Sequence, residues 1–155
     1  MDLSKVKWIV IIAVVVGAIF LASGPGVNAM YNRATKAVVG QDPTRDAADE
    51  ATLSKYGGYL TTLLQYEKAE KFYSASIDRY GPDGKNFWWN IYKRARCYEK
   101  MRKYEDAVGD LYFLWREDGD SYDERVPENY ILKNRIAKLI EVHQFDSNMY
   151  PGIIE

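Results

Sequence analysis

The acidic stretch EDGDSYDE, residues 117–124, is the part of the chain whose side chains could most directly perform chemistry. Carboxylates at alternate positions ligate calcium in loops, and two fixed carboxylates can act as general acid and base. Tyr122 stands where a calcium loop needs its third oxygen ligand, so the spacing argues against that site. An enzyme using Asp118 and Asp120 would need both in a dry cleft, whereas five carboxylates in eight residues favour a solvated loop. We therefore expect no catalytic residue and no metal here.

Other reactive side chains are scarce. Cys97 is the only cysteine, which excludes an internal disulfide and any cysteine-rich zinc site. His143 is the only histidine and lies on an apolar helix face, where a core or interface histidine is more common than a catalyst. The sequence contains no glycine-rich phosphate loop and no nucleophile elbow. We predict that the chain is not an enzyme and needs no cofactor.

The composition indicates a globular chain with broad contact surfaces. Of 155 residues, 47% are hydrophobic and 28% are charged, and the net charge is −1. Duplex nucleic acid requires clustered Lys and Arg, and no basic block stands out, so nucleic acid is not an expected partner. The 13 Tyr, 4 Trp and 5 Phe are typical of packed helices.

An uncharged apolar run of residues 8–22 follows the first lysines. Residues 6–23 approach the roughly 20 apolar residues that a membrane span needs. Trp8, Lys5 and Lys7 would mark the membrane interface, and the following Ser-Gly-Pro-Gly would end the helix. This pattern predicts an N-terminal transmembrane anchor in contact with the lipid bilayer.

A cleaved signal peptide is the alternative, with Val27-Asn28-Ala29 as the cleavage site before Met30. Both interpretations favour an exported remainder, because lysines precede the first apolar helix. Arg33 and Lys36 weaken this bias, so a cytoplasmic domain on an inverted anchor stays open. We expect a single-pass membrane protein with its C-terminal domain on the periplasmic or extracytoplasmic side.

The rest of the chain has helical periodicity throughout. A short helix is expected over 28–41, and Asp42-Pro43 has the form of an N-cap followed by proline at the first helical position. Apolar stripes then recur at spacings of three and four residues, without sustained alternation. The last helix is expected over 129–145. The predicted fold is therefore all-α.

Two stretches share the pattern Tyr-Glu-x-Ala, at 66–69 and 104–107. Twelve residues before each alanine stands another small residue, and small residues let two helix backbones approach closely. Gly57 would face Ala69 in the first antiparallel hairpin, and Ala95 would face Ala107 in the second.

At these residues the sequence resembles the tetratricopeptide repeat, a 34-residue helix-turn-helix motif with the pattern W-x2-L-G-x2-Y…A-x3-F. Tyr73 and Tyr98 occupy aromatic positions of that motif. The resemblance covers residues 50–117 and is imperfect, since the first Trp is absent, Arg94 replaces a leucine, and the copies are 38 residues apart. Two copies bury less core than the three or more that such arrays need, which favours a partner chain or self-association.

The resemblance implies a short helical superhelix of two repeats plus a capping helix. The predicted parts are an N-terminal anchor or signal peptide (1–27), a connecting helix and linker (28–49), the helical domain (50–145) and a C-terminal tail (146–155).

Members of this family hold a peptide or helix in a groove lined by the first helix of each repeat, which implies two groups of groove residues. The first repeat contributes Ser54, Gly58, Thr61 and Thr62, and the second contributes Trp89, Tyr92, Arg96, Glu99 and Lys100. Trp, Tyr and Arg dominate interface energetics, so the second group is the expected anchor. Packing of Trp89 and Tyr92 between the repeats is the alternative.

The expected function is that of a non-catalytic, membrane-anchored interaction module, an accessory or scaffold subunit of a membrane or envelope complex. Its partners would be other protein subunits or a second copy. The alternative is a periplasmic chaperone-like factor of secretion or assembly machinery.

Overall fold

The structure is a computed structural model that describes residues 3–154, without the side chains of residues 3–5, 18, 19, 21 and 22. No residue in this range lies in a strand, and the all-α prediction is confirmed. The long helices are α1 (Leu3–Ala22), α2 (Gly24–Thr35), α3 (Pro43–Thr62), α4 (Tyr66–Tyr80), α5 (Phe87–Lys100), α6 (Tyr104–Arg116) and α8 (Asn129–His143). Short turns of helix are α7 (Gly119–Tyr122), η1 (Gly81–Asp83) and η2 (Ser147–Met149).

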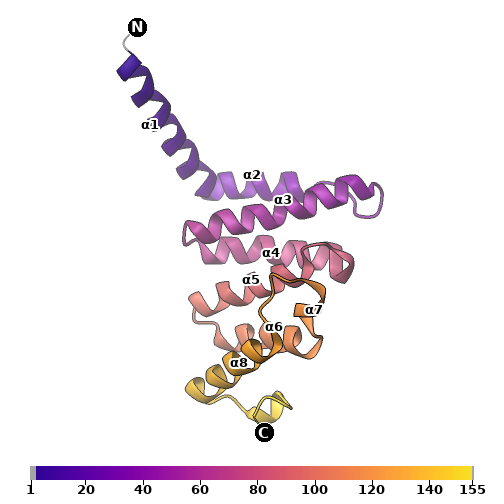
Figure 1. The fold of residues 1–155 in the computed structure, drawn as a ribbon. Coiled ribbons are helices and arrows are strands. Elements are labelled where there is room, and N and C mark those ends of the chain that lie inside the picture. Colours follow the sequence, from indigo (N-terminus) through magenta and orange to yellow (C-terminus); the bar gives the residue numbers. More distant parts are fainter. Residues whose placement is uncertain (1–2, 155) are drawn as a thin grey trace.

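The helices form a stack in which each packs on the next. The order is α2, α3, α4, α5, α6 and α8, and α1 projects away from the end of the stack at α2 (Figure 1). Buried apolar side chains form two adjoining clusters. One joins α2, α3 and α4 around Phe72 and Leu60, and the other joins α5, α6 and α8 around Leu111 and Ile136.

The Ser-Gly-Pro-Gly stretch both ends α1 and begins α2. Ser23 is the N-cap of α2, and its hydroxyl accepts a hydrogen bond from the N–H of Gly26 at 3.4 Å. Pro25 occupies the first turn, where a missing N–H costs nothing. The helix expected over 28–41 therefore begins earlier than its apolar residues suggest.

The predicted single-pass membrane topology is wrong. Within the described part of the chain, no helix is both long and apolar enough to cross a bilayer. The uncharged run 8–22 extends over only about 22 Å of helix, against a hydrocarbon core of roughly 30 Å. Lys7 and Trp8 are exposed on α1, and the side chain of Lys5 lies outside the described residues. The predicted membrane localisation is therefore wrong, whereas the predicted contact of the N-terminal helix with lipid stays a prediction.

The start of α3 is confirmed. The carboxylate of Asp42 accepts hydrogen bonds from the N–H groups of Thr44 and Arg45 at 3.0 and 3.2 Å. Pro43 is the first helical residue. The cap satisfies two of the donors that every helix leaves free at its N-terminus.

The turns that join α3 to α4 and α5 to α6 have the same backbone. Leu64 and Arg102, 38 residues apart, both adopt the left-handed conformation, with φ of 60° and 62°. The N–H of the next residue closes each turn onto the carbonyl five residues earlier, from Gln65 to Leu60 and from Lys103 to Tyr98, at 2.9 Å in both cases. The two Tyr-Glu-x-Ala stretches begin α4 and α6. The internal similarity of the sequence therefore coincides with a repeated local geometry.

The small residues of both hairpins are buried. Gly57, Ala69, Ala95 and Ala107 all lie in helix contacts, Tyr73 is 1% exposed, and Tyr98 is half-buried. Arg94, which departs from the repeat pattern, extends to Asp110 on α6 and forms two hydrogen bonds of 2.8 Å. Burial raises the pKa of the Asp110 carboxyl, and the Arg94 guanidinium acts in the opposite direction. An ion pair thus stands between α5 and α6 where the motif has an apolar contact.

Residues 146–154, after α8, pack against the stack. Tyr150 and Ile153 are buried in the cluster of α6 and α8. The hydroxyl of Tyr112 donates to the carbonyl of Pro151 at 3.2 Å, and Gly152 lies against the ring of Trp115. The tail therefore covers aromatic surface of α6.

Candidate protein-binding groove

A groove runs along one side of the stack between α5 and its neighbours. One pocket of about 470 Å³ lies between the end of α5 and α8, and a second of about 280 Å³ lies between the end of α3 and α5. Arg96 and Lys100 line both pockets, so the two form one continuous surface. We call this surface the α5 groove. It is lined by Thr61, Tyr66, Trp89, Tyr92, Lys93, Arg96, Glu99, Lys100, Tyr104, Arg135, Lys138, Leu139, Val142 and His143.

Aromatic rings occupy the α3 end of the α5 groove. The rings of Trp89 and Tyr92 lie 5.6 Å apart between centroids, one helical turn apart on α5. The ammonium of Lys93 lies 5.3 Å from the Trp89 ring, within the range of a cation–π interaction. The guanidinium of Arg125, from the loop after α7, lies 5.5 Å from the same ring. The Trp89 ring thus contacts the cations of Lys93 and Arg125, and the residue is half-buried.

An ion pair crosses the groove at its α8 end. The guanidinium of Arg135 on α8 donates two hydrogen bonds to the Glu99 carboxylate on α5, with 2.6 Å between Nε and Oε1. These hydrogen bonds raise the pKa of Arg135 above its ordinary value. Arg96 lies 3.9 Å from the same carboxylate. Glu99 therefore ties α5 to α8, two helices that otherwise flank the groove.

The structure brings together all five residues of the second predicted group and only one of the four residues of the first group. Trp89, Tyr92, Arg96, Glu99 and Lys100 all line the α5 groove, together with Thr61. Ser54, Gly58 and Thr62 line neither of its pockets. The Thr62 hydroxyl instead donates to the carbonyl of Gly58 within α3.

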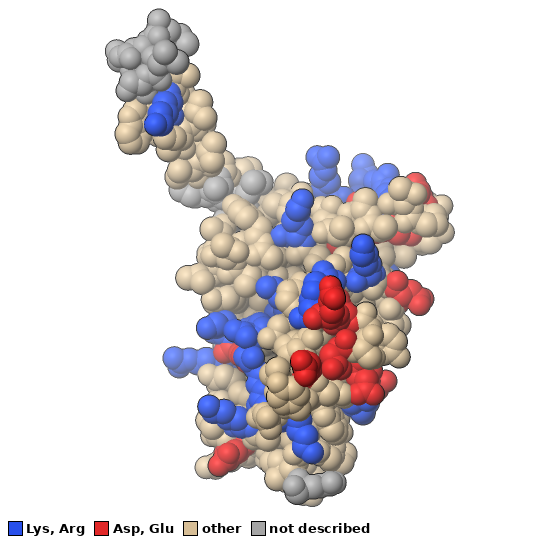
Figure 2. Space-filling view, in the orientation of Figure 1, with Lys and Arg blue, Asp and Glu red and all other residues tan. Residues whose placement is uncertain are grey.

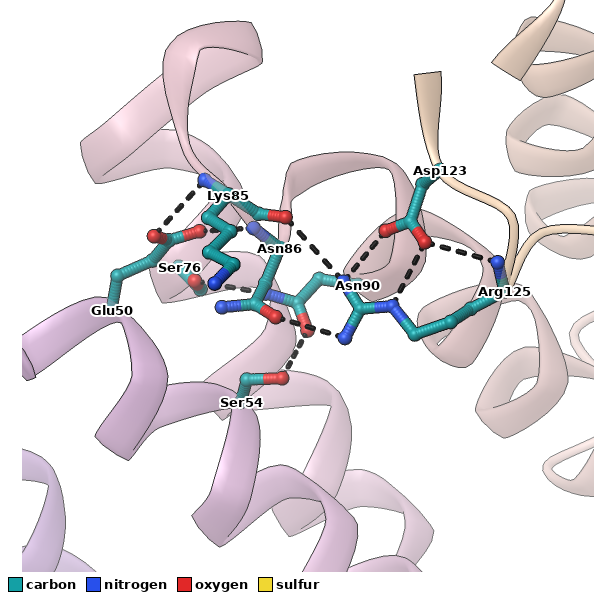
Figure 3. Close-up of polar contacts among 8 residues, drawn as sticks. All are labelled: Glu50, Ser54, Ser76, Lys85, Asn86, Asn90, Asp123 and Arg125. Carbon is teal, nitrogen blue, oxygen red and sulfur yellow. Dashed lines mark hydrogen bonds and ion pairs between the residues drawn. The ribbon is translucent and has the colours of Figure 1, made fainter. Parts of the chain in front are cut away.

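Ser54 belongs to a buried polar network that joins three helices (Figure 3). Its hydroxyl donates to Oδ1 of Asn90 at 2.8 Å, and Nδ2 of Asn90 donates to the Ser76 hydroxyl at 2.9 Å. Nearby, the buried Glu50 accepts from the N–H groups of Lys85 and Asn86 at 3.1 and 2.6 Å, at the start of α5. Every polar atom of this network points to a protein partner, which favours a structural role.

The α8 side of the groove was missed by sequence reasoning. The sequence predicts only a capping helix over residues 129–145, yet α8 contributes the lining residues Arg135, Lys138, Leu139, Val142 and His143. Arg135, Lys138 and Val142 are spaced by three and four residues, which places them on one helix face. That spacing could have predicted that α8 forms a second, charged side of the groove.

The acidic stretch 117–124 is held by local contacts. Asp118 and Asp120 both accept from Asn129, the first residue of α8, through its side chain and its backbone N–H. Asp123 accepts two hydrogen bonds from the Arg125 guanidinium, at 2.8 and 2.6 Å. Burial raises the pKa of Asp123, but hydrogen bonds and charge from Arg125 lower it overall. Among the described residues, no group of His, Cys, Asp and Glu has an arrangement that could hold a metal ion.

The remaining reactive side chains are packed. Cys97 is fully buried near Thr61, and burial raises the pKa of its thiol. The His143 ring stacks on Tyr104 with 3.8 Å between centroids.

Charge is unevenly distributed over the surface. Lys and Arg gather along the edge where α5 and α8 end, and Asp and Glu gather near α7 (Figure 2). Lys100 and Lys138 of the α5 groove lie towards these ends of α5 and α8.

Comparison with known protein families, with curated proteins and with solved structures found no match.

Proposed function

We propose that this chain is a non-catalytic protein-interaction module of the tetratricopeptide-repeat type, acting as an accessory or scaffold subunit of a protein complex. The observation that carries the proposal is the α5 groove, where the Trp89–Tyr92 pair and the Glu99–Arg135 pair line one continuous surface. Half-buried aromatic residues beside arginines are the composition of interface anchors.

The repeated turns support the choice of repeat type. The left-handed residues Leu64 and Arg102 recur at the 38-residue spacing of the sequence similarity. The end of α8 has the same form, because Gln144 is left-handed with φ of 56° and the N–H of Phe145 bonds to the carbonyl of Ile140. Helices α3, α5 and α8 would then be the equivalent first helices that line the groove.

Photo-crosslinking from inside the groove tests this function. Tyr92 is replaced by p-benzoylphenylalanine in the full chain, which is then irradiated in its native cells. The expected product is one predominant crosslinked protein, reduced by the additional substitution Trp89→Ala.

The same probe at Tyr130 is the control, since Tyr130 is 62% exposed and lies outside the α5 groove. Equal crosslinking from both positions, or none from Tyr92, would contradict the proposal. A ladder of many weak products from Tyr92 alone would indicate a chaperone-like factor with transient clients.

A further inference from the structure

The α5 groove is strongly basic within a chain whose net charge is −1. Its lining includes five cationic side chains and one carboxylate: Lys93, Arg96, Lys100, Arg135 and Lys138, with Glu99. Glu99 is already bound by Arg135 in a bidentate pair. The groove therefore keeps a positive excess after its own ion pair is formed.

Two lysines of the groove have no anion of their own. No ion pair or hydrogen bond of Lys100 or Lys138 occurs among the residues whose side chains are described, and both side chains are exposed. Arg96 is 42% exposed and reaches Glu99 only at 3.9 Å. These three cations line one pocket, Arg96 and Lys100 from α5 and Lys138 from α8, so an anionic segment in the pocket would have cations on both sides.

Apolar surface lies directly beside these cations. Leu139, Val142 and the ring of Tyr104 line the same pocket, and Val142 is 61% exposed. Contact of the exposed Val142 side chain with water is unfavourable, and an apolar side chain of a partner would remove this surface from water. The pocket thus offers cations and a small apolar surface together.

We propose that the occupant of the α5 groove is an acidic peptide segment of another protein, with an apolar residue next to its carboxylates. The carboxylates contact Lys100, Lys138 and Arg96, and the apolar residue covers Leu139 and Val142. This inference rests on the proposed interaction function and adds the chemistry of the partner.

Single-stranded nucleic acid also binds to aromatic and basic surfaces, but this groove suits it poorly. A phosphate chain would have to pass the Glu99 carboxylate, which lies at the α8 end of the groove beside Arg96 and Arg135. A peptide can place an apolar or neutral residue at that point, because its charges need not be continuous.

A second copy of this chain also fits less well. The acidic stretch 117–124 would be its natural contribution, but Asp118 and Asp120 are bonded to Asn129 and Asp123 to Arg125. Those carboxylates would have to leave partners within their own chain before they could reach a neighbour.

Selection from a random peptide library tests the proposal. A phage-displayed library of random dodecamers is selected on the immobilised full chain, and the most enriched peptide is synthesised with a fluorophore for anisotropy titrations. Enriched sequences should carry several Asp or Glu beside an apolar residue. Their affinity should fall as salt is added, because charge attraction at an open surface is screened.

Charge reversal at the free lysines supplies the matched measurement. The double variant Lys100→Glu/Lys138→Glu should weaken binding of the selected peptide by roughly tenfold or more, since like charges would then face each other. The control Lys36→Glu/Lys55→Glu makes the same change at exposed lysines outside the α5 groove and should leave affinity within about twofold. Val142→Ser should weaken binding about threefold or more, whereas Ile131→Ser, on an exposed part of α8 outside the pocket, should not.

The outcomes separate this inference from the function on which it rests. Peptides that bind at Tyr92 but are neutral or basic would overturn the acidic partner and leave the interaction function standing. Failure to select any peptide above an empty-support control would count against both. Tighter binding of a fluorescent 20-nucleotide dT strand than of the peptide, or a concentration-dependent dimer abolished by Lys100→Glu/Lys138→Glu, would replace the peptide with nucleic acid or a second copy.

Discussion

The ring of Tyr73 on α4 lies directly over Gly57 on α3. A Cβ added at Gly57 would come within 2.7 Å of Cε1 of Tyr73, closer than real Cβ atoms approach. A Cβ added at the next residue, Gly58, would lie 3.9 Å from its nearest neighbour, the Tyr73 hydroxyl oxygen. The first hairpin is therefore closed by an aromatic ring that only a glycine admits.

This contact predicts opposite effects for two neighbouring substitutions. Gly57→Ala should lower the free energy of unfolding by about 1–2 kcal/mol, because overpacking against a fully buried ring exceeds the gain in helix propensity. Gly58→Ala should raise it by up to about 1 kcal/mol, since only the propensity gain remains. Urea titrations of both variants check this pair, and an equal response would contradict the close contact.

Alkaline pH should destabilise the fold through Tyr73. Burial raises the pKa of Tyr73 to about 12, while the hydrogen bond with Thr61 acts in the opposite direction. A phenol with a raised folded-state pKa contributes stability below its unfolded pKa near 10, and this stability is lost as the pH rises towards 12. The full loss is on the order of 2–3 kcal/mol for a two-unit shift.

The measurement is the difference between Tyr73→Phe and the unsubstituted chain in unfolding free energy at pH 8 and pH 11.5. Relative to the unsubstituted chain, Tyr73→Phe should have a higher free energy of unfolding at pH 11.5 than at pH 8. Tyr122→Phe, at a ring that is 68% exposed, should show no such change.

The two left-handed turns predict stabilising glycines. Leu64 is 69% exposed and Arg102 is exposed, so neither side chain contributes much burial where it stands. Leu64→Gly and Arg102→Gly should each stabilise the chain by about 0.5–1 kcal/mol, because glycine adopts positive φ without steric cost. Gln65→Gly, one residue later and outside the left-handed region, should destabilise it. Thermal unfolding of the three variants is the measurement. Stabilisation by only one of Leu64→Gly and Arg102→Gly would refute the equivalence of the two turns.

Removal of the Glu50 carboxylate should destabilise the loop that leads into α5. Glu50 is 4% exposed and accepts from two backbone N–H groups of the connecting loop. Glu50→Ala leaves these donors without their acceptor and should cost about 2 kcal/mol. Amide hydrogen exchange should accelerate at Lys85 and Asn86, whereas Glu67→Ala, an exposed carboxylate at the start of α4, should leave both rates unchanged.

The helices could be predicted because their evidence is local. Asp42-Pro43 begins α3, and the Tyr-Glu-x-Ala stretches begin α4 and α6, as their residue types require. The groove was only half predicted, since the family pattern gives the α5 wall but does not extend to α8. The second wall depends on the path of the 117–128 loop, which Asp120 and Asp118 fix by bonding Asn129. Such pairings between distant residues leave no periodic pattern in the sequence.

The N-terminal prediction failed on the length of the apolar run. The helix ends at the expected place, but the uncharged residues 8–22 extend over only about 22 Å, which is shorter than a hydrocarbon core of roughly 30 Å. Ser23 ends one helix and caps the next, so the apolar run cannot be extended towards Met30.

The Ser54–Asn90–Ser76 network also bears on how such a stack avoids misassembly. Two hairpins with the same turns and the same small-residue contacts could pair in the wrong order. The positions 38 residues further on are Tyr92, Glu128 and Leu114, which cannot reproduce the network. An arrangement in which one hairpin takes the place of the other would therefore leave the fully buried Asn90 amide without its two partners. The hydrogen bonds of one asparagine thus specify which helices meet at the junction of α3, α4 and α5, whereas the contacts within the two similar hairpins do not.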